Sequence, residues 1–336
     1  MSKIARSRSI GSATWRAVSS QPLIPAGLVL IALFGVIEPN FASGSNALNI
    51  ATQASVLLIA ATAMTFVILT AGIDLSVGAM IFLAGALVTS TWLQSLPPAL
   101  ALVLVALCCA VLGGLNGLGV AVVGVPAMIV TLATLQIFRG LGGHITGQRS
   151  VIVDDDLRFM GRGDVAGIPL PFVVAIAVIL FGTFVLRRTV FGRFVQAIGS
   201  NQPAAMNAGL PVKRVLIGVY AFAGLLVGIA AMVQVGRLGA VQPTLGSGFE
   251  LTVITAVVLG GTSLTGGRGS VIGTMIGALI LAIVENGLVL IGASAYIFDI
   301  VRGAVLLSAL LLSGIPQQLL RRLRADSSST PQSART

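Results

Sequence analysis

Long apolar runs separated by short polar segments dominate this sequence. Only 9% of its 336 residues are charged and 56% are apolar, whereas a water-soluble domain carries about 25% charged residues. A helix of about 20 apolar residues crosses a bilayer core, where the backbone must satisfy its own hydrogen bonds. We therefore predict an all-α polytopic membrane protein with about ten transmembrane helices. Their expected positions are residues 22–38, 48–70, 76–96, 98–123, 126–143, 168–186, 215–236, 251–264, 269–292 and 296–314.

Basic residues set the expected orientation of these helices. Cytoplasmic loops of membrane proteins are enriched in Lys and Arg, so an even number of crossings must separate two basic clusters. Six crossings and then four satisfy this condition. The three clusters are Lys3, Arg6, Arg8 and Arg16; Arg187, Arg188, Arg193, Lys213 and Arg214; and Arg321, Arg322 and Arg324.

This orientation divides the chain into three parts. We expect a cytoplasmic N-terminal tail at residues 1–20, one transmembrane domain at 21–320 and a disordered cytoplasmic tail at 321–336, which is rich in Ser. Within the domain, 187–214 forms a cytoplasmic loop and 144–167 an exterior loop. The first span has features of a cleaved signal peptide, but we expect it to be retained, since no polar domain follows it.

The cytoplasmic loop has a regular pattern. Apolar Phe191, Phe194, Ala197 and Ile198 recur at helical spacing, which predicts a short helix with one apolar face. Asn201 and Pro203 suit a stop and a new helix start at Ala204, and Gly209 and Pro211 suit its end. The residues alone leave two interpretations open: a docking surface for a partner, or an amphipathic linker on the lipid surface.

Two glycine-rich segments interrupt apolar runs. AGIDLSVG at 71–78 places Asp74 at membrane depth, where a carboxylate is costly, so Asp74 either caps the next helix or lies near a transport path. GGTSLTGGRGSVIGTMIG at 260–277 carries Arg268 as its only charge. The two segments share the order of apolar helix, glycine-rich break and small-residue helix, which indicates an internal repeat.

Several functions are excluded by what the sequence lacks. A phosphate-binding P-loop needs a Lys followed by Ser or Thr after its glycines, and the only two lysines, Lys3 and Lys213, do not fit. The chain therefore has no recognisable means of hydrolysing ATP. It shows no nucleophile–base pair, metal-ligand spacing or nucleic-acid-binding pattern, so we expect no enzyme activity, no cofactor and no nucleic-acid partner.

Five motifs resemble one known family. GIDLSVG at 72–78, NG at 116–117, IVTLAT at 129–134 with RG at 139–140, FGRFVQAIGSNQPAA at 191–205 and GGTSLTGGRGS at 260–270 occur in the order found in permease subunits of bacterial ABC importers for simple sugars, the ribose-type group. The resemblance covers nearly the whole chain. Ala127 and Met128 depart from it, because relatives more often carry an aromatic residue there.

The resemblance implies an ABC importer permease fold in the bacterial cytoplasmic (inner) membrane. It implies a cytoplasmic ATPase subunit, an extracytoplasmic sugar-binding protein and a second permease copy as partners, beside membrane lipid. It also implies that the 191–205 segment contacts the ATPase, which favours the docking interpretation. The implied ATPase-coupling residues are Phe191, Gly192, Arg193, Ala197, Ile198, Gly199, Asn201, Ala204 and Ala205.

Two further residue sets are candidates for the transport site. The translocation path candidates are Asp74, Asn116, Thr131, Glu285 and Asn286. The glycine-rich break comprises Gly260, Gly261, Gly266, Gly267, Arg268 and Gly269. Because aromatics are only 5% of the chain, and Trp92, Tyr220 and Tyr296 are its only polar-tipped aromatics near spans, we expect weak contacts with a solute rather than a high-affinity sugar pocket.

Two other functions remain as alternatives. The same architecture suits an ABC permease for another small polar solute, such as an amino acid, and the ligand of the cognate binding protein would distinguish the two. A secondary transporter working alone would instead need intramembrane ionisable residues for ion coupling. Asp74, Arg139 and Glu285 are the few candidates for that role.

Overall fold

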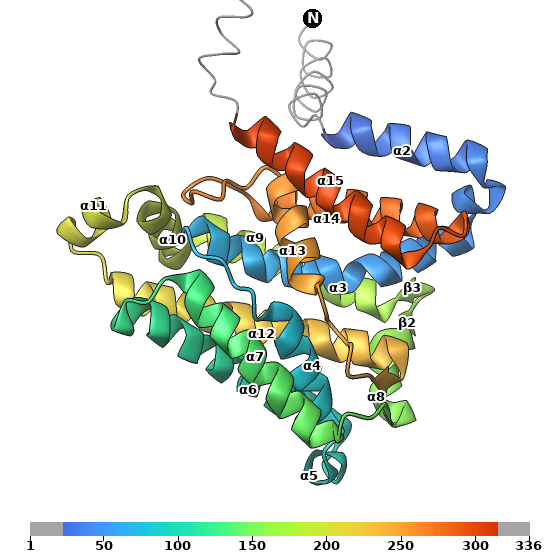
Figure 1. Cartoon of the computed structure of the whole chain (residues 1–336), viewed down its shortest axis with the longest axis horizontal. Coiled ribbons are helices and arrows are strands. Elements are labelled where there is room, and N and C mark those ends of the chain that lie inside the picture. Colours follow the sequence, from blue (N-terminus) through green and yellow to red (C-terminus); the bar gives the residue numbers. More distant parts are fainter. Residues whose placement is uncertain (1–22, 315–336) are drawn as a thin grey trace, which may run out of the picture.

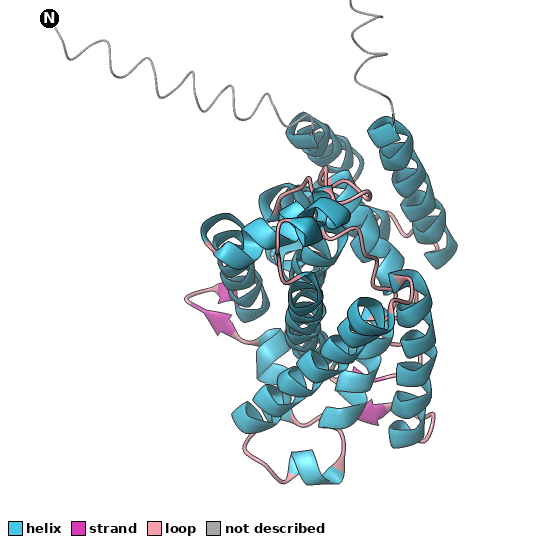
Figure 2. Ribbon diagram, turned by 90° about the vertical axis from the view of Figure 1, so that its left-hand side faces the viewer, coloured by secondary structure: helices cyan, strands magenta, loops and turns pink. Residues whose placement is uncertain are grey.

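The computed structural model describes residues 23–314, and most of them are helical. Figure 2 shows helices throughout the body, with the short strands confined to the connections between them. The tails expected at 1–20 and 321–336, with their basic clusters, lie outside the described residues.

Helices occur at all ten predicted positions, but they are not ten full spans. Six of the described helices are long and apolar enough to cross a membrane: α3 (Gly44–Leu69), α6 (Pro98–Leu118, continued by the π-helical turn η2, Gly119–Val123), α7 (Ala127–Thr146), α9 (Leu170–Arg188), α12 (Val212–Leu238) and α14 (Val271–Leu290). The shorter apolar helices are α2 (Leu23–Ile37), α4 (Val77–Val88) and α13 (Phe249–Leu259). The structure therefore supports a helical multi-pass membrane protein and does not confirm the number ten.

Polar residues explain why the third predicted span is short. Residues 76–96 form α4 and the single turn α5 (Thr91–Gln94) rather than one helix. The hydroxyls of Thr89 and Ser90 donate to the carbonyls of Ala86 and Leu87, at 2.9 and 2.5 Å, and Ser90 has an extended backbone. These local bonds compete with continuation of the helix. The eighth predicted span, 251–264, is also shorter than expected: α13 ends at Leu259, with Gly260 as its C-cap.

Helices α3 and α12 form the interior of the molecule. In α3, 89% of the most apolar stretch is buried, against 22% in α7, so α3 is an internal helix and α7 faces outward. Figure 1 shows α12 between α3 and the pair α6 and α7, and α12 packs against α6, α3 and α8 (Asp155–Arg162). The last helix, α15 (Ala295–Gly314), packs on α13.

Glycines allow α6 and α12 to approach closely. A Cβ added at Gly224 would collide with the carbonyl of Cys109, and one added at Gly113 with the carbonyl of Tyr220. Small residues commonly permit this kind of backbone contact between membrane helices. This close contact fixes the position of α6 against α12.

Gly224→Ala is therefore expected to destabilise the folded chain, by about 1–3 kcal/mol as typical of overpacking. The matched control is Gly114→Ala, because a Cβ there meets only Ala221 Cβ at 3.7 Å. Thermal unfolding of the two purified variants should show a lower midpoint for Gly224→Ala alone. Equal midpoints would contradict the close α6–α12 contact.

The two ends of the molecule differ in their connections. One end, which we call the α8 end, carries α8 and two antiparallel strand pairs. The pairs are β1 (Val151–Ile152) with β4 (Ala240–Val241), and β2 (Asp164–Val165) with β3 (Ile168–Pro169). The opposite end, the α10 end, carries α10 (Val190–Ser200) and α11 (Gln202–Asn207). The predicted loops 144–167 and 187–214 thus lie at opposite ends.

Candidate functional site

The loop predicted to couple to an ATPase forms two short helices, α10 and α11. The Thr189 hydroxyl accepts the amide of Gly192 at 3.2 Å and caps α10. The Asn201 side chain accepts the amide of Ala204 at 3.0 Å and caps α11. The chain therefore stops one helix at Asn201 as predicted, but the next helix begins at Gln202 rather than at Ala204. Side-chain caps at both starts give these short helices a defined geometry.

The predicted apolar face of α10 needs a correction. Its fully buried residues are Gly192, Val195 and Ile198, whereas Ala197 is exposed. Phe191 and Phe194 are only partly buried, and they pack against the core of the same chain. The apolar face therefore holds α10 on its own protein. The exposed residues left for a partner include Arg193, Ala197, Ser200, Asn201, Gln202, Pro203 and Ala204, beside the exposed Val190, Met206 and Asn207, while Ala205 is buried.

Gly199 lies at the junction between α10 and both glycine-rich breaks. A Cβ at this position would collide with the carbonyl of Leu69 and lie 2.6 Å from the amide of Gly267. Leu69 ends α3, just before the first break, and its carbonyl accepts the Gly267 amide of the second break at 2.9 Å. The two breaks, about 200 residues apart in sequence, thus meet beneath one turn of α10 (Figure 1).

The first break is held by a buried polar cluster. Asp74 accepts the amide and the hydroxyl of Ser76 at 2.8 and 2.6 Å. Asn116 of α6 donates to the Ser76 hydroxyl at 3.0 Å, and the Thr131 hydroxyl of α7 donates to the Ile73 carbonyl at 3.1 Å. Three path candidates, Asp74, Asn116 and Thr131, are therefore brought together, and all three are buried. Their bonds order the turn that begins α4.

Asp74→Asn is expected mainly to reduce the amount of folded protein, because an amide accepts weaker hydrogen bonds than a carboxylate. Ser76→Ala removes the hydroxyl that donates to Asp74 and accepts from Asn116, so it should also reduce the amount of folded protein. Size-exclusion profiles of the solubilised chain, compared with uptake per folded molecule, distinguish folding from transport. A normal amount of folded Asp74→Asn that has lost uptake would assign Asp74 to the path instead.

The second glycine-rich break, at the start of the 260–277 segment, has a backbone that depends on its glycines. Gly261, Gly266 and Gly267 have left-handed φ angles of 84°, 82° and 72°, which glycine adopts without steric cost. Arg268 is exposed, and its carbonyl accepts the amide of Ser263 at 2.9 Å. Neither Gly260 nor Gly269 has room for a side chain: Gly260 lies against Gly273 of α14, and Gly269 against Thr262.

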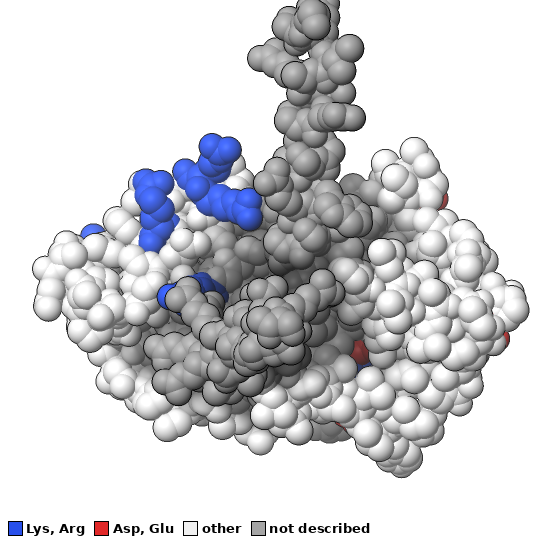
Figure 3. Space-filling view, turned by 90° about the horizontal axis from the view of Figure 1, so that it is seen from above, with Lys and Arg blue, Asp and Glu red and all other residues white. Residues whose placement is uncertain are grey.

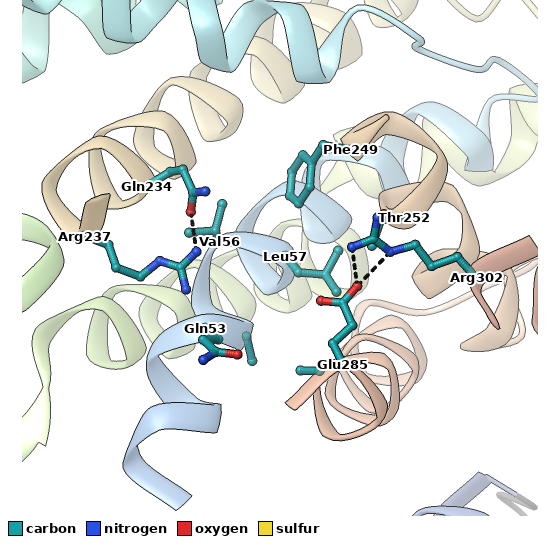
Figure 4. Close-up of a pocket in the computed structure, with 11 residues that line it drawn as sticks. Gln53, Val56, Leu57, Gln234, Arg237, Phe249, Thr252, Glu285 and Arg302 are labelled. Atoms are coloured by element: carbon teal, nitrogen blue, oxygen red, sulfur yellow. Dashed lines mark hydrogen bonds and ion pairs between the residues drawn. The ribbon is translucent and has the colours of Figure 1, made fainter. Parts of the chain in front are cut away.

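A polar cavity lies nearer the α8 end, between five helices. Its volume is about 190 Å³, and its polar lining residues are Gln53 (α3), Gln234 and Arg237 (α12), Thr252 (α13), Glu285 (α14) and Arg302 (α15). Figure 4 shows Arg237, Gln234 and Gln53 on one side and Glu285 with Arg302 on the other, with Phe249 and Leu57 between them. The cavity thus combines charged walls with an apolar face, as binding pockets usually do.

Two bonded pairs position the charged groups of this cavity. Arg302 donates to Glu285 Oε1 from Nη2 and Nε, at 2.8 and 2.9 Å, and it also pairs with the exposed Asp299 at 3.5 Å. Arg237 Nη2 donates to Gln234 Oε1 at 3.1 Å. No carboxylate of the described residues forms a salt bridge with Arg237.

The remaining path candidate, Asn286, does not line this cavity. It exchanges two hydrogen bonds with Asn46, at 2.9 and 3.0 Å, and both residues are buried. This reciprocal amide pair joins α14 to the start of α3. Neighbouring Glu285 and Asn286 therefore face different surroundings.

Sequence reasoning missed five of the polar cavity residues: Gln53, Gln234, Arg237, Thr252 and Arg302. One signal was present, since Gln234 and Arg237 are three positions apart and so share a helix face. A charge such as Arg302 inside an apolar run is a second signal. Their convergence with Glu285 depends on tertiary packing, which no local pattern reports.

Charge distribution separates the two ends. Six exposed basic residues lie in α9, α10, the start of α12 and the second break: Arg187, Arg188, Arg193, Lys213, Arg214 and Arg268. At the α8 end the exposed Arg149 and Arg162 are accompanied by the exposed acidic residues Asp154, Asp155, Asp156 and Asp164. On the face drawn in Figure 3, Lys and Arg side chains gather toward the α10 end. This asymmetry has the form expected of a cytoplasmic surface.

The comparison with known proteins decides the family. Residues 46–310 match the family described as the permease component of the branched-chain amino acid transport system. The chain belongs to this family. It is 41% identical to the ribose import permease protein of Bacillus subtilis strain 168 over 290 residues, which cover 84% of this chain and 89% of the relative. It is 40% identical to the ribose import permease protein of Escherichia coli K12 over 302 residues, which cover 88% of this chain and 94% of the relative.

A third relative is named for a different sugar, D-allose. The chain is 35% identical to the D-allose transport system permease protein of Escherichia coli K12 over 288 residues, which cover 84% of this chain and 88% of the relative. No solved structure matches the chain. Like the relatives, the chain is a permease subunit rather than an enzyme, which agrees with the lack of a P-loop.

Proposed function

We propose that this chain is the membrane-spanning permease subunit of an ABC importer for a simple sugar in a bacterial cytoplasmic membrane. The observation that carries this proposal is the extent of the match to permeases named for ribose and allose. Although the family's description names branched-chain amino acids, these relatives are named for sugars. A sugar is therefore the better-supported solute class.

In the proposed topology the α10 end faces the cytoplasm and the α8 end faces outward. The basic surface supports this orientation. ATPase subunits would bind the exposed face of α10 and α11, a sugar-binding protein would approach the α8 end, and a second permease copy would complete the membrane unit. Movement of α10 would reach both breaks at once through Gly199 and its contacts with Leu69 and Gly267.

The path candidates divide into two roles. Glu285 lines the polar cavity and is proposed to contact the solute. Asp74, Asn116, Thr131 and Asn286 are proposed to hold helices in position, since each is buried and hydrogen-bonded within the protein.

Reconstitution tests the proposal. The chain, its ATPase subunits and the binding protein are placed in proteoliposomes, and uptake of ribose, allose and an amino acid is measured with and without ATP. ATP-dependent sugar uptake is expected, with no nucleotide hydrolysis by the permease alone. Amino-acid uptake alone would support the other solute class, and uptake without the ATPase would indicate a stand-alone transporter.

A further inference from the structure

Arg237 is shared by two hollows of the molecule. Besides the polar cavity, it lines a larger hollow of about 580 Å³ at the α8 end, together with Asn49, Thr52, Arg162, Asp164 and Pro169. The Arg237 carbonyl accepts Arg162 Nε at 3.1 Å, which fixes the last turn of α12 beside this hollow. Arg237 is the lining residue that the two hollows have in common.

Two buried polar atoms of the cavity residues also lack hydrogen-bond partners within the described part of the chain. Arg237 Nε and Thr252 Oγ1 are buried and have no hydrogen-bond partner among the described residues, although both residues line the cavity. Buried polar atoms are costly unless something bonds to them. A volume of about 190 Å³ holds several waters, each of which occupies about 30 Å³ in the liquid, so water or the hydroxyls of a solute can bond to the polar side chains that line the cavity.

Charge and shape indicate the class of solute. Arg302 is paired with Glu285, whereas Arg237, in the last turn of α12, has no salt-bridged carboxylate among the described residues. Part of its guanidinium is therefore available to donate to a solute. Glu285 shares the cavity and would oppose an anion. The Phe249 ring supplies an apolar face between the two polar walls. A neutral polyol matches this set, because it offers hydroxyls to the walls and C–H groups to the ring.

We infer that this cavity is a transient contact site for a neutral monosaccharide, and that Arg237 is the residue that admits it from the outer hollow. Arg237 donates to sugar hydroxyls, Glu285 accepts from them, and Arg302 positions Glu285. The inference rests on the proposed sugar import and adds the residues that contact the sugar on its way.

The test uses the complete importer in membrane vesicles. Arg237→Met removes the donors while keeping a long side chain, and Arg237→Lys keeps the charge without the planar fork. We expect maximal uptake to fall about tenfold or more for Arg237→Met, since a hydrogen bond to a charged group contributes about this factor, and to fall less for Arg237→Lys. ATPase copurification should remain normal in both.

Asp299→Asn is the matched control. Asp299 also pairs with Arg302, yet it is exposed and does not line the cavity, so uptake should stay within about twofold of the wild type. A normally abundant Arg237→Met chain that imports sugar at the wild-type rate would overturn the inference. If the wild type imports no sugar at all, the proposed function fails instead.

A second measurement does not depend on the stability of the Arg237 variants. Gln53→Cys, in a chain with Cys108 and Cys109 replaced by alanine, places one thiol at the cavity wall. Labelling by a hydrophilic thiol reagent should slow when millimolar ribose or allose is added, whichever is imported, and should not slow with a hexuronate. Unchanged labelling in a variant that still imports sugar would contradict the contact site, and protection by the hexuronate alone would contradict its neutral specificity.

Discussion

Replacing Gly199 with leucine is expected to abolish uptake while the chain still inserts into the membrane. The collision of a side chain at 199 with the Leu69 carbonyl and the Gly267 amide would separate α10 from both breaks, and the 2.9 Å bond between Leu69 and Gly267 would be strained or lost. Because backbone atoms cannot yield as a flexible side chain can, even Gly199→Ala should impair transport. Uptake per chain in membrane vesicles measures both effects.

The control for this substitution is Gly44→Leu. Gly44 begins α3, and a Cβ there meets no atom within 4 Å, so the added bulk should leave uptake near the wild-type value. Copurification distinguishes two causes of failure. If Gly199→Leu keeps its ATPase but hydrolysis no longer drives uptake, the damage lies within the permease, as the buried contact implies. Normal coupled uptake by this variant would refute the junction.

Charge reversal at Arg193 should have the second-largest effect, acting on assembly. Arg193 is exposed on the side of α10 that faces away from the chain's own core, where it can bind a carboxylate on the proposed ATPase. In Arg193→Glu that attraction becomes repulsion, which costs several kcal/mol when two like charges are juxtaposed. Copurified ATPase is therefore expected to fall about tenfold or more at normal permease abundance.

Lys213→Glu makes the same charge change in the same loop. Lys213 is exposed at the start of α12 and lies outside α10 and α11, so it controls for net charge and for membrane orientation. We expect the ATPase subunit to copurify with Lys213→Glu in the same amount as with the wild type. Equal loss of ATPase in both variants would show that the loop acts only through its overall charge.

Apolar runs predicted the long helices closely because lipid requires each of them to be a continuous apolar helix of about 20 residues. The run at 269–292 became α14, Val271–Leu290, and the run at 48–70 became α3, Gly44–Leu69. The same criterion failed at 76–96, where apolar composition continued past Thr89 and Ser90 but their hydroxyl bonds ended the helix. Average hydropathy does not register that competition.

The site was harder to predict for two physical reasons. On α10 the periodicity of apolar residues selected Ala197, whereas the buried face includes Gly192, which has no side chain for a hydropathy pattern to score. The cavity is built from residues on five helices that are far apart in sequence, and the Glu285–Arg302 pair joins α14 to α15. Because this convergence depends on how the helices pack, the sequence analysis identified Glu285 but not its salt-bridge partner Arg302.

The shortness of α13 has a consequence for how the chain enters the membrane. Its 11 residues extend about 16 Å at 1.5 Å per residue, about half of a hydrocarbon core of about 30 Å. Such a segment is a poor independent unit for insertion, and its glycine-rich continuation needs protein around it at membrane depth. Of the helices that pack on α13, α3 is synthesised before it and α14 and α15 after it. We therefore expect α13 to be held in the bilayer by packing on both sides of it in sequence, and a chain that stops before α14 should retain α13 less well.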